Sequence, residues 1–352
     1  MNILFVMKHR GNAGNTHAVA NYIRVAPKYG HNVAMYGEPL DYLPEIRFSR
    51  DVRAFDRVAY LFESEIYRLN RLDETRLLGI IPKRHRMIFD MDGMYHPLTR
   101  VDDYDFNHAS EAGQRHWKEY YDTLSDVVMK PMLAKSDDPR VRPMIFYGYD
   151  PALETPLGSV QDKQYDIMHL GHNWWRWRDV GQKFLPAIAP VRERIGDIGF
   201  IGLWWDGPPA EGKDAGPEAA FESDPALIRR LRVSTEDSVM YTDVVRKMGT
   251  AKINIFTQRP VLHHMKHITL KYFEVFYADT IPLLMLDEDI ALQVYGPAAR
   301  ELMLRENIAD KVVDALERPG HYRDVVASVR KHLAANNSYD KRMAELVSAL
   351  PE

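Results

Sequence analysis

The sequence contains no cysteine among its 352 residues. This absence excludes disulfides, thiolate catalysis and thiolate metal sites, and it is typical of a protein from a reducing compartment. A long apolar run is missing from the start of the chain as well. The apolar run there, residues 3–7, has five residues and ends before Lys8. Such a run is too short for a signal segment or a membrane span, so we expect a cytoplasmic protein without an integral membrane segment.

A large net charge is also absent. The chain carries 46 Lys and Arg residues against 50 Asp and Glu residues, which gives a formal net charge of -4. This balance provides no overall electrostatic reason to bind nucleic acid or an anionic membrane, so we expect small-molecule chemistry and no nucleic-acid partner. The hydrophobic fraction of 45% is sufficient for two domains with buried cores.

Short apolar runs alternate with helical patterns in the first half of the chain. Residues 3–7 predict a strand, residues 16–28 a helix that stops at Gly30, and residues 32–37 the next strand, which together make a βαβ unit. Further strands are predicted at residues 57–62, 86–91, 126–130 and 143–148. Residues 150–166 form a polar segment with two prolines and no periodicity. We place a domain boundary inside this segment, at residue 160.

The same alternation begins again after this boundary. A helix is predicted over residues 178–195, and a helical pattern continues from Asp287 to the end. Strands of the second series are predicted at residues 165–171, 199–205, 238–241, 252–256 and 280–286. The fold class that fits both series is α/β, with two Rossmann-like doubly wound sheets in tandem.

In open α/β sheets, ligands bind beyond the carboxyl ends of the strands, so a site is sought in the loops that follow strands. The first of these loops contains Gly11, Asn12 and Gly14 just before a predicted helix, where glycine lets the backbone approach a ligand. Neither the GxGxxG fingerprint nor a P-loop is present. A plain tight turn and a binding loop therefore both remain open here.

The equivalent loop of the second half, residues 171–181, combines Gly171 and His172 with two arginines. Arg176 and Arg178 stand at the start of a predicted helix, where their charges oppose the helix dipole. A bound phosphate would explain the two charges. The alternative is that this segment simply packs its three tryptophans against the sheet.

The segment TLKYFEVFYADTIPLL, residues 269–284, places a carboxylate in a run of aromatic and aliphatic residues. Thr269 is predicted to cap a helix whose first amides, with Lys266 and Lys271 nearby, favour a phosphate. Glu274 lies about one turn further along, where a buried carboxylate is unfavourable unless polar groups meet it. We expect either a solvated edge residue or a group that accepts hydrogen bonds from two ribose hydroxyls.

Together these segments resemble the group 1 glycosyltransferases of the GT-B fold, and most closely the subset known as spore-maturation-protein-like glycosyltransferases. The resemblance rests on residues 144–153, 166–179, 239–256, 269–284 and 312–346. It implies two Rossmann-like domains that face a cleft, with the acceptor held by residues 1–160 and a nucleotide-sugar donor by residues 161–330. It also implies that residues 331–352 form a helix that returns to the first domain.

The resemblance assigns roles to individual residues. It places Glu274 on the donor ribose, the amides of Thr269 and Leu270 on the pyrophosphate, and Tyr241 on the base. Two positions depart from the family pattern, because Lys266 stands where many members have a glutamate and Asp279 where they have a glycine. The full set expected to bind the donor is Gly171, His172, Arg176, Arg178, Tyr241, Lys266, Thr269, Leu270, Lys271 and Glu274. The set expected in the acceptor-side loop is Gly11, Asn12 and Gly14.

The implied reaction moves a sugar from a nucleoside-diphosphate sugar to an acceptor hydroxyl. Arginine and lysine charges stabilise the leaving diphosphate, so we expect no metal and no cofactor. Asp92 and His96 are the candidates that orient or deprotonate the hydroxyl, unless one carboxylate of the Asp90 and Asp92 pair caps a turn and the other is solvated. His263 and His267 lie one helical turn apart and raise a zinc alternative, which the lack of an obvious third ligand disfavours.

Three functions from different classes follow. A metal-independent, retaining glycosyltransferase is the function that the resemblance favours. A nucleotide-sugar epimerase of similar architecture is the main alternative, although it needs more acid and base residues in the cleft than the sequence indicates. A two-domain binding protein is the third, and it normally carries an export signal, which we do not find. For the acceptor, a glycan, a peptide and a small metabolite all remain open.

Overall fold

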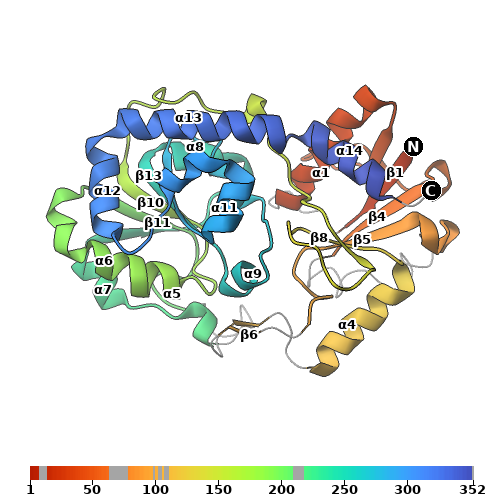
Figure 1. Ribbon diagram of the computed structural model, residues 1–352, viewed down its shortest axis with the longest axis horizontal. Coiled ribbons are helices and arrows are strands. Elements are labelled where there is room, and N and C mark those ends of the chain that lie inside the picture. Colours follow the sequence, from red (N-terminus) through yellow and green to blue (C-terminus); the bar gives the residue numbers. More distant parts are fainter. Residues whose placement is uncertain are drawn as a thin grey trace.

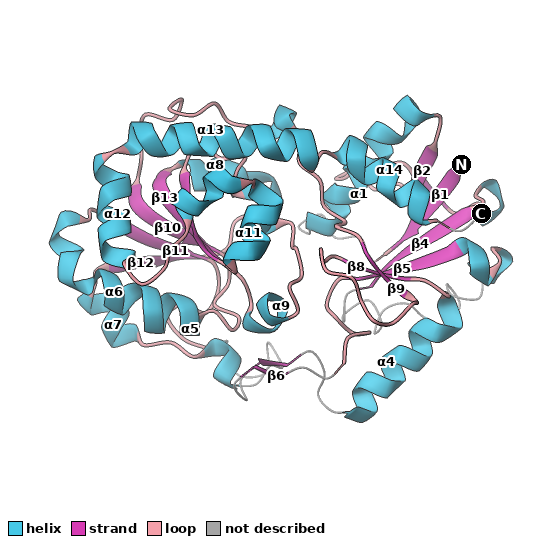
Figure 2. Cartoon of the chain, viewed as in Figure 1, coloured by secondary structure: helices cyan, strands magenta, loops and turns pink. Residues whose placement is uncertain are grey.

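The computed structural model describes residues 1–7, 14–62, 78–97, 100–101, 105–106, 111–208 and 218–350. Within these ranges the chain forms two parallel β-sheets that lie side by side, each with helices packed on it (Figure 1 and Figure 2). A small antiparallel ribbon is made by β6 (Arg100–Val101) and β7 (Asp105–Phe106). The predicted α/β class with two doubly wound domains is confirmed.

The first sheet is built around strands that are buried on both faces. Apolar runs such as ILFV in residues 3–6 explain this burial, since a central parallel strand has no solvated side. In spatial order the strands are β3 (Phe48–Ser49), β2 (Asn32–Tyr36), β1 (Asn2–Val6), β4 (Arg57–Phe62), β5 (Arg86–Asp90), β8 (Val128–Lys130) and β9 (Val141–Pro143). The helices of this domain include α1 (Gly14–Val25) and α4 (Glu111–Leu124).

The strand predicted at residues 143–148 is wrong. The last strand of the first sheet is β9, and residues 144–148 continue from it as buried irregular chain. The carbonyl oxygen of Phe146 accepts a hydrogen bond from the hydroxyl of Tyr22 at 2.7 Å. A side chain thus satisfies this buried carbonyl, and the apolar run fills the core without joining the ladder.

The second sheet has its longest strands in the centre. In spatial order the strands are β12 (Val233–Glu236), β11 (Ile198–Ile201), β10 (Tyr165–Leu170), β13 (Ala251–Thr257) and β14 (Ile281–Met285). The strand predicted at residues 238–241 is wrong, because the edge strand β12 is polar and lacks the apolar run that the prediction relies on. Tyr241 instead begins a short 3-10 helix.

The helices of the second domain are mostly short. The helix predicted over residues 178–195 is present from Trp177 to Arg194, interrupted by a π-turn at Val180–Phe184 and ended by a 3-10 segment. The α-helices are α5 (Trp177–Asp179), α6 (Leu185–Ile188), α7 (Pro225–Arg230), α8 (Val244–Gly249), α9 (Pro260–His264), α10 (Lys271–Glu274), α11 (Glu288–Tyr295) and α12 (Ile308–Glu317). No helix in the described part of the chain is long and apolar enough to cross a membrane.

Two C-terminal helices connect the domains. Figure 1 shows α13 (Pro319–Asn336) running along the second domain and α14 (Tyr339–Ala349) lying beside α1. The ring of Tyr339 meets that of Tyr22 edge-on at 5.7 Å, and Asp340 pairs with Lys28 at 3.1 Å. The last helix therefore packs on the first domain.

A buried arginine fixes α13 to the segment that follows α10. Arg330 is 6% exposed, and its guanidinium donates to the carbonyl oxygens of Phe276 at 2.8 Å, Ala278 at 2.8 Å and Thr155 at 2.9 Å. Arginine is suited to this position because its planar group holds several donors in a fixed geometry. One side chain thus joins α13, the α10 segment and the interdomain linker.

Asp279, which stands where the resemblance expects glycine, holds the same linker from the other side. Its carboxylate accepts hydrogen bonds from the amides of Gly158 at 2.7 Å and Val160 at 2.8 Å, and it pairs with Lys163 at 3.2 Å. These bonds satisfy a buried carboxylate and give the aspartate a structural role.

We expect Arg330→Met to lower the free energy of unfolding by about 2–4 kcal/mol, because it removes the hydrogen bonds that the guanidinium donates to carbonyl groups of the α10 segment and the linker. The exposed neighbour change Lys331→Met, on the same helix, serves as the control and should shift stability by less than about 0.5 kcal/mol. Urea denaturation followed by tryptophan fluorescence measures both. Equal midpoints for the two variants would contradict the role of Arg330.

Candidate active site

A pocket of about 330 Å³ opens between the two domains, beyond the carboxyl ends of β10 and β13. Residues of the first domain form part of its wall, including Asn15. The second domain contributes the charged groups Arg176, Arg259, Lys271 and Glu274. Three cations and one carboxylate give the described lining an excess of positive charge, which favours an anionic ligand.

The domains approach each other closely at one edge of this pocket. The ring of His17, on α1, stacks on Tyr241 with 4.4 Å between ring centroids and 15° between planes. A Cβ atom on Gly14 would lie 2.2 Å from Leu270 Cδ2, so a larger residue would displace the leucine side chain. Gly14 thus contacts the predicted donor segment. Two other residues of its loop lie outside the described residues, Gly11 and Asn12.

Glu274 is buried at this pocket and is 8% exposed. Its carboxylate accepts a hydrogen bond from the hydroxyl of Tyr241 and interacts with the charge of Lys271. Burial raises the pKa of Glu274, while Lys271 and Tyr241 oppose the rise. The expectation of a solvated edge residue is therefore wrong, and the carboxylate lines a pocket in which a ligand can donate hydrogen bonds to it.

Lys271 lies almost one turn before Glu274 and lines the same pocket. Its Nζ donates a hydrogen bond to the carbonyl oxygen of Leu170, the last residue of β10. Burial of the amine, with the charge of Arg176 added, lowers the pKa of Lys271 to about 7, against the opposing effect of Glu274. The amine thus lies at the boundary between its charged and neutral forms near neutral pH.

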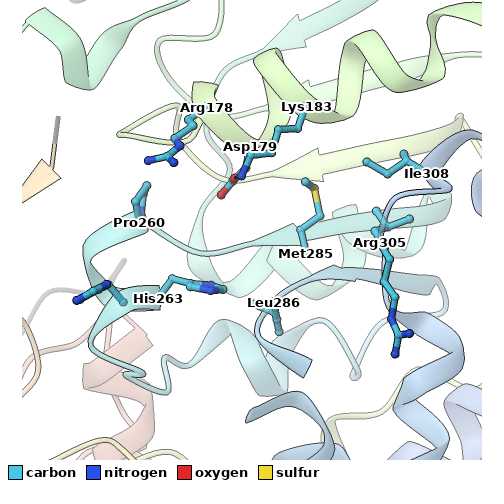
Figure 3. A pocket seen from close by; sticks show the side chains of 11 residues that line it. Arg178, Asp179, Lys183, Pro260, His263, Met285, Leu286, Arg305 and Ile308 are labelled. Atoms are coloured by element: carbon cyan, nitrogen blue, oxygen red, sulfur yellow. Dashed lines mark hydrogen bonds and ion pairs between the residues drawn. The ribbon is translucent and has the colours of Figure 1, made fainter. Parts of the chain in front are cut away.

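The two predicted arginines face different pockets. Arg176 lines the interdomain pocket, and its Nη1 donates to the carbonyl oxygen of His172 at 2.8 Å, which fixes the guanidinium. Arg178 lines a separate pocket of about 440 Å³ in the second domain, together with His263 of α9 (Figure 3). The structure therefore brings Arg176 and not Arg178 to the other donor-site candidates.

Gly171 and His172 lie beside the interdomain pocket. Both line a smaller pocket of about 150 Å³ that shares Tyr241 with the larger one. A Cβ atom on Gly171 would lie 2.7 Å from Lys271 Nζ, so this glycine allows the lysine to reach the strand end. His172 Nδ1 accepts a hydrogen bond from the amide of Leu203 at 3.0 Å, which orients its ring.

The helix start differs from the prediction. Leu270 occupies the N-cap of α10 and no side chain caps it, so Thr269 does not act as the cap, although both residues line the pocket. The amide of Ile268 donates to the carbonyl oxygen of Pro131 in the first domain at 2.5 Å and is not available to a phosphate. Lys266 is exposed and does not belong to the described lining of the pocket.

Asp90 organises the turn that carries the predicted catalytic residues. It is fully buried and accepts hydrogen bonds from the amides of Met94 at 2.7 Å and Tyr95 at 3.0 Å and from the hydroxyl of Tyr121 at 3.0 Å. Burial raises the pKa of Asp90 to about 6, although Lys130 and these bonds oppose the rise. Asp90 is thus the carboxylate that caps the turn.

His96 and Asp92 lie on this turn, and His96 faces the second domain. His96 Nδ1 is 3.1 Å from Lys130 Nζ, and its ring centroid is 6.5 Å from that of His267. Burial, with the charges of Lys130 and His96, lowers the pKa of His267 to about 3. Asp92 is half-buried. Neither Asp92 nor His96 belongs to the described lining of the interdomain pocket, and His96 lies at a neighbouring part of the interface.

Several residues of this region were not singled out from the sequence. Lys130 is the last residue of β8 and Arg259 lies two residues beyond β13, and this position at the carboxyl end of a parallel strand is the available signal. Gln258 Nε2 donates to the carbonyl oxygen of His267 at 2.5 Å and its Oε1 accepts from the hydroxyl of Tyr272 at 3.1 Å, which fixes the approach to α10. In the described part of the chain, no group of three or more His, Asp and Glu side chains is placed to hold a metal ion.

No family model matches the sequence, and no curated protein matches it. Solved structures match its fold. The T4 phage β-glucosyltransferase in complex with UDP-glucose is 12% identical, with a TM-score of 0.60 over 100% of both chains. An α-glucosyltransferase in complex with UDP is 11% identical, with a TM-score of 0.62 over 100% of this chain and 99% of the other. The chain therefore has the GT-B fold, as expected from the sequence.

Two further structures of these enzymes hold ligands that bear on the predictions. One is the T4 phage β-glucosyltransferase in complex with UDP and Mn²⁺, with 12% identity and a TM-score of 0.58 over 100% of both chains. The other is the α-glucosyltransferase with UDP and a 13-mer DNA, with 11% identity and a TM-score of 0.61 over 100% of this chain and 99% of that one. These ligands belong to the neighbours and define alternatives that an assay of this chain has to include.

We expect the effect of Asp90→Asn on stability to depend on pH. Because burial raises the pKa of Asp90 to about 6, the protonated form stabilises the fold at low pH, and this contribution is lost as the pH rises through 6. The stability difference between wild type and variant should therefore shrink by about 2 kcal/mol from pH 4 to pH 7. The exposed Asp126→Asn is the control. Urea denaturation curves that give the same difference at every pH would contradict this assignment.

Proposed function

We propose that this chain is a glycosyltransferase that moves a sugar from a nucleoside-diphosphate sugar to an acceptor hydroxyl. The observation that carries the proposal is the interdomain pocket, in which Glu274 lies beside Lys271, with Arg176 and Arg259 in the same lining. Ribose hydroxyls donate hydrogen bonds and a diphosphate carries negative charge, so a nucleoside diphosphate complements both parts of this set. The UDP and UDP-glucose of the structural neighbours support a uridine nucleotide as the donor.

The proposed chemistry uses charges that are fixed before the reaction. The bond between the anomeric carbon and the β-phosphate oxygen breaks, and the acceptor oxygen bonds to that carbon. Negative charge develops on the leaving diphosphate, where preorganised cations stabilise the transition state more than the ground state. Arg176, Arg259 and Lys271 are the cations in reach. We therefore propose transfer without a metal ion and without a cofactor.

On the acceptor side, we propose that Asp92 and His96 orient or deprotonate the hydroxyl. The turn that carries them is held by Asp90 and faces the second domain at His267. The neighbour with bound DNA speaks weakly against the expectation that nucleic acid plays no part, so DNA joins glycans, peptides and small metabolites as an acceptor to assay. The retaining outcome and the spore-maturation-protein-like subset rest on sequence resemblance alone.

The epimerase alternative is less well supported by the pocket. An epimerase requires an acid and a base on either side of one sugar carbon. The described lining holds one carboxylate, Glu274, and no histidine. A transferase needs its acid-base group only on the acceptor side, where Asp92 and His96 lie.

We expect UDP at about one hundred times its dissociation constant to stabilise the protein by about 2.7 kcal/mol, visible as a shift in thermal unfolding. Glu274→Gln should weaken UDP binding about 10–100-fold, since it removes the charge from hydrogen bonds with the ribose. The exposed Glu193→Gln, in the 3-10 segment before β11 and outside the described lining of the pocket, should leave the shift intact.

Parallel samples with GDP, dTDP and ADP test the choice of base, and samples with EDTA or Mn²⁺ test metal independence. The proposal requires a shift with one diphosphate that persists in EDTA. A shift that disappears in EDTA would refute metal independence, and equal shifts in wild type and Glu274→Gln would remove Glu274 from the donor site.

A further inference from the structure

Gly171 makes room for two nitrogen atoms beneath the donor pocket. A Cβ atom at this position would lie 2.7 Å from Lys271 Nζ and 3.4 Å from His169 Nε2, so both side chains converge on the same small volume. The Lys271 amine donates there to the carbonyl oxygen of Leu170. The amine is therefore held against the end of β10 by a neutral acceptor.

His169 adds no counter-charge for this amine. Its Nδ1 lies 3.0 Å from the carbonyl oxygen of Ile255, and because a carbonyl only accepts, Nδ1 carries the proton of the neutral ring. Burial, followed by the charges of Lys271 and Arg176, lowers the pKa of His169 well below its ordinary value. Its Nε2 is buried without a hydrogen-bond partner in the described part of the chain. His169 thus stays neutral and presents only a lone pair.

The charged groups around the Lys271 amine leave it in a positive environment. Arg176, after β10, and Arg259, after β13, line the same pocket as the amine. Glu274, on α10, is the one carboxylate of the described lining, and the hydroxyl of Tyr241 already donates to it. Burial of the amine and the charge of Arg176 disfavour the ammonium form, and Glu274 favours it, so an entering anion would tip this balance toward the charged amine.

We propose that Lys271 takes up a proton when the diphosphate of the donor enters the pocket, so that donor binding is coupled to protonation of this amine. The negative charges of the diphosphate favour the ammonium form, which then pairs with a phosphate oxygen. One proton moves from solvent to Nζ, and no covalent bond between heavy atoms changes. The inference rests on the proposed function and adds a pH-dependent role for one residue of its donor site.

The sign of the effect follows from the pKa of Lys271. Burial and the charge of Arg176 lower it to about 7 without donor, so the amine is mostly charged at pH 6 and mostly neutral at pH 8. A bound diphosphate raises this pKa, and proton uptake therefore grows as the pH rises through 7. Donor binding changes the protonation of Glu274 in the opposite direction. Hydrogen bonds from the ribose hydroxyls lower the pKa of its carboxylate, which then releases protons.

The experiment is titration calorimetry of the full chain with UDP-glucose at pH 6, 7 and 8, each in buffers with different ionisation enthalpies. UDP-glucose is the probe because its diphosphate is esterified at both ends and does not titrate in this range. The dependence of the binding heat on the buffer gives the number of protons taken up. We expect the smallest uptake at pH 6 and an uptake that grows as the pH rises through 7 to its largest value at pH 8.

Two variants assign the proton to its residue. Lys271→Arg keeps a permanent positive charge, so it should bind UDP-glucose with no uptake at pH 8. Lys252→Arg changes an exposed lysine at the amino end of β13, outside the described lining of the interdomain pocket, and should leave the uptake as in the wild type.

The outcomes separate this inference from the proposed function. Binding of UDP-glucose with no uptake at pH 8, or with the same uptake in Lys271→Arg, would overturn the proton coupling and leave the donor site standing. Absence of binding of both UDP-glucose and UDP to the wild type would overturn both.

Discussion

The site depends on one short segment, residues 268–279, that is held at both ends. At its start the amide of Ile268 bonds to Pro131 of the first domain, and at its end Asp279 and Arg330 tie it to the linker and to α13. The helix between these anchors has four residues, too few to be stable alone in water. Tertiary hydrogen bonds, and not helix propensity, therefore set its geometry.

This anchoring holds two ionisable side chains of the segment in a buried environment. Glu274 is buried and the Lys271 amine turns toward β10, and burial disfavours the charged form of each. The proposed nucleoside diphosphate would bring hydroxyl donors to Glu274 and negative charge to Lys271 and Arg176. Because Tyr241 and Leu270 also contact α1, the same region sets how closely the domains approach. The donor pocket and the domain arrangement are thus one structural unit.

The sequence predicts those features that follow from apolar runs. The central strands of both sheets were found this way, whereas β12 was missed because an edge strand is polar, and residues 144–148 were misread because buried chain is not always a strand. Glu274 stood out as a carboxylate in an apolar run. The separation of Arg176 from Arg178 depends on the path of the chain after β10, and the meeting of His96 with His267 depends on domain packing. Neither is visible in one sequence.

The central claim is that Glu274 holds the donor ribose, and the most direct test compares UDP with 2′,3′-dideoxy-UDP on wild type and Glu274→Gln by titration calorimetry. We predict that wild type binds the dideoxy nucleotide about 10–100-fold more weakly than UDP, and that this preference largely disappears in the variant. Equal affinity of the wild type for both nucleotides, or an unchanged preference in Glu274→Gln, would contradict it.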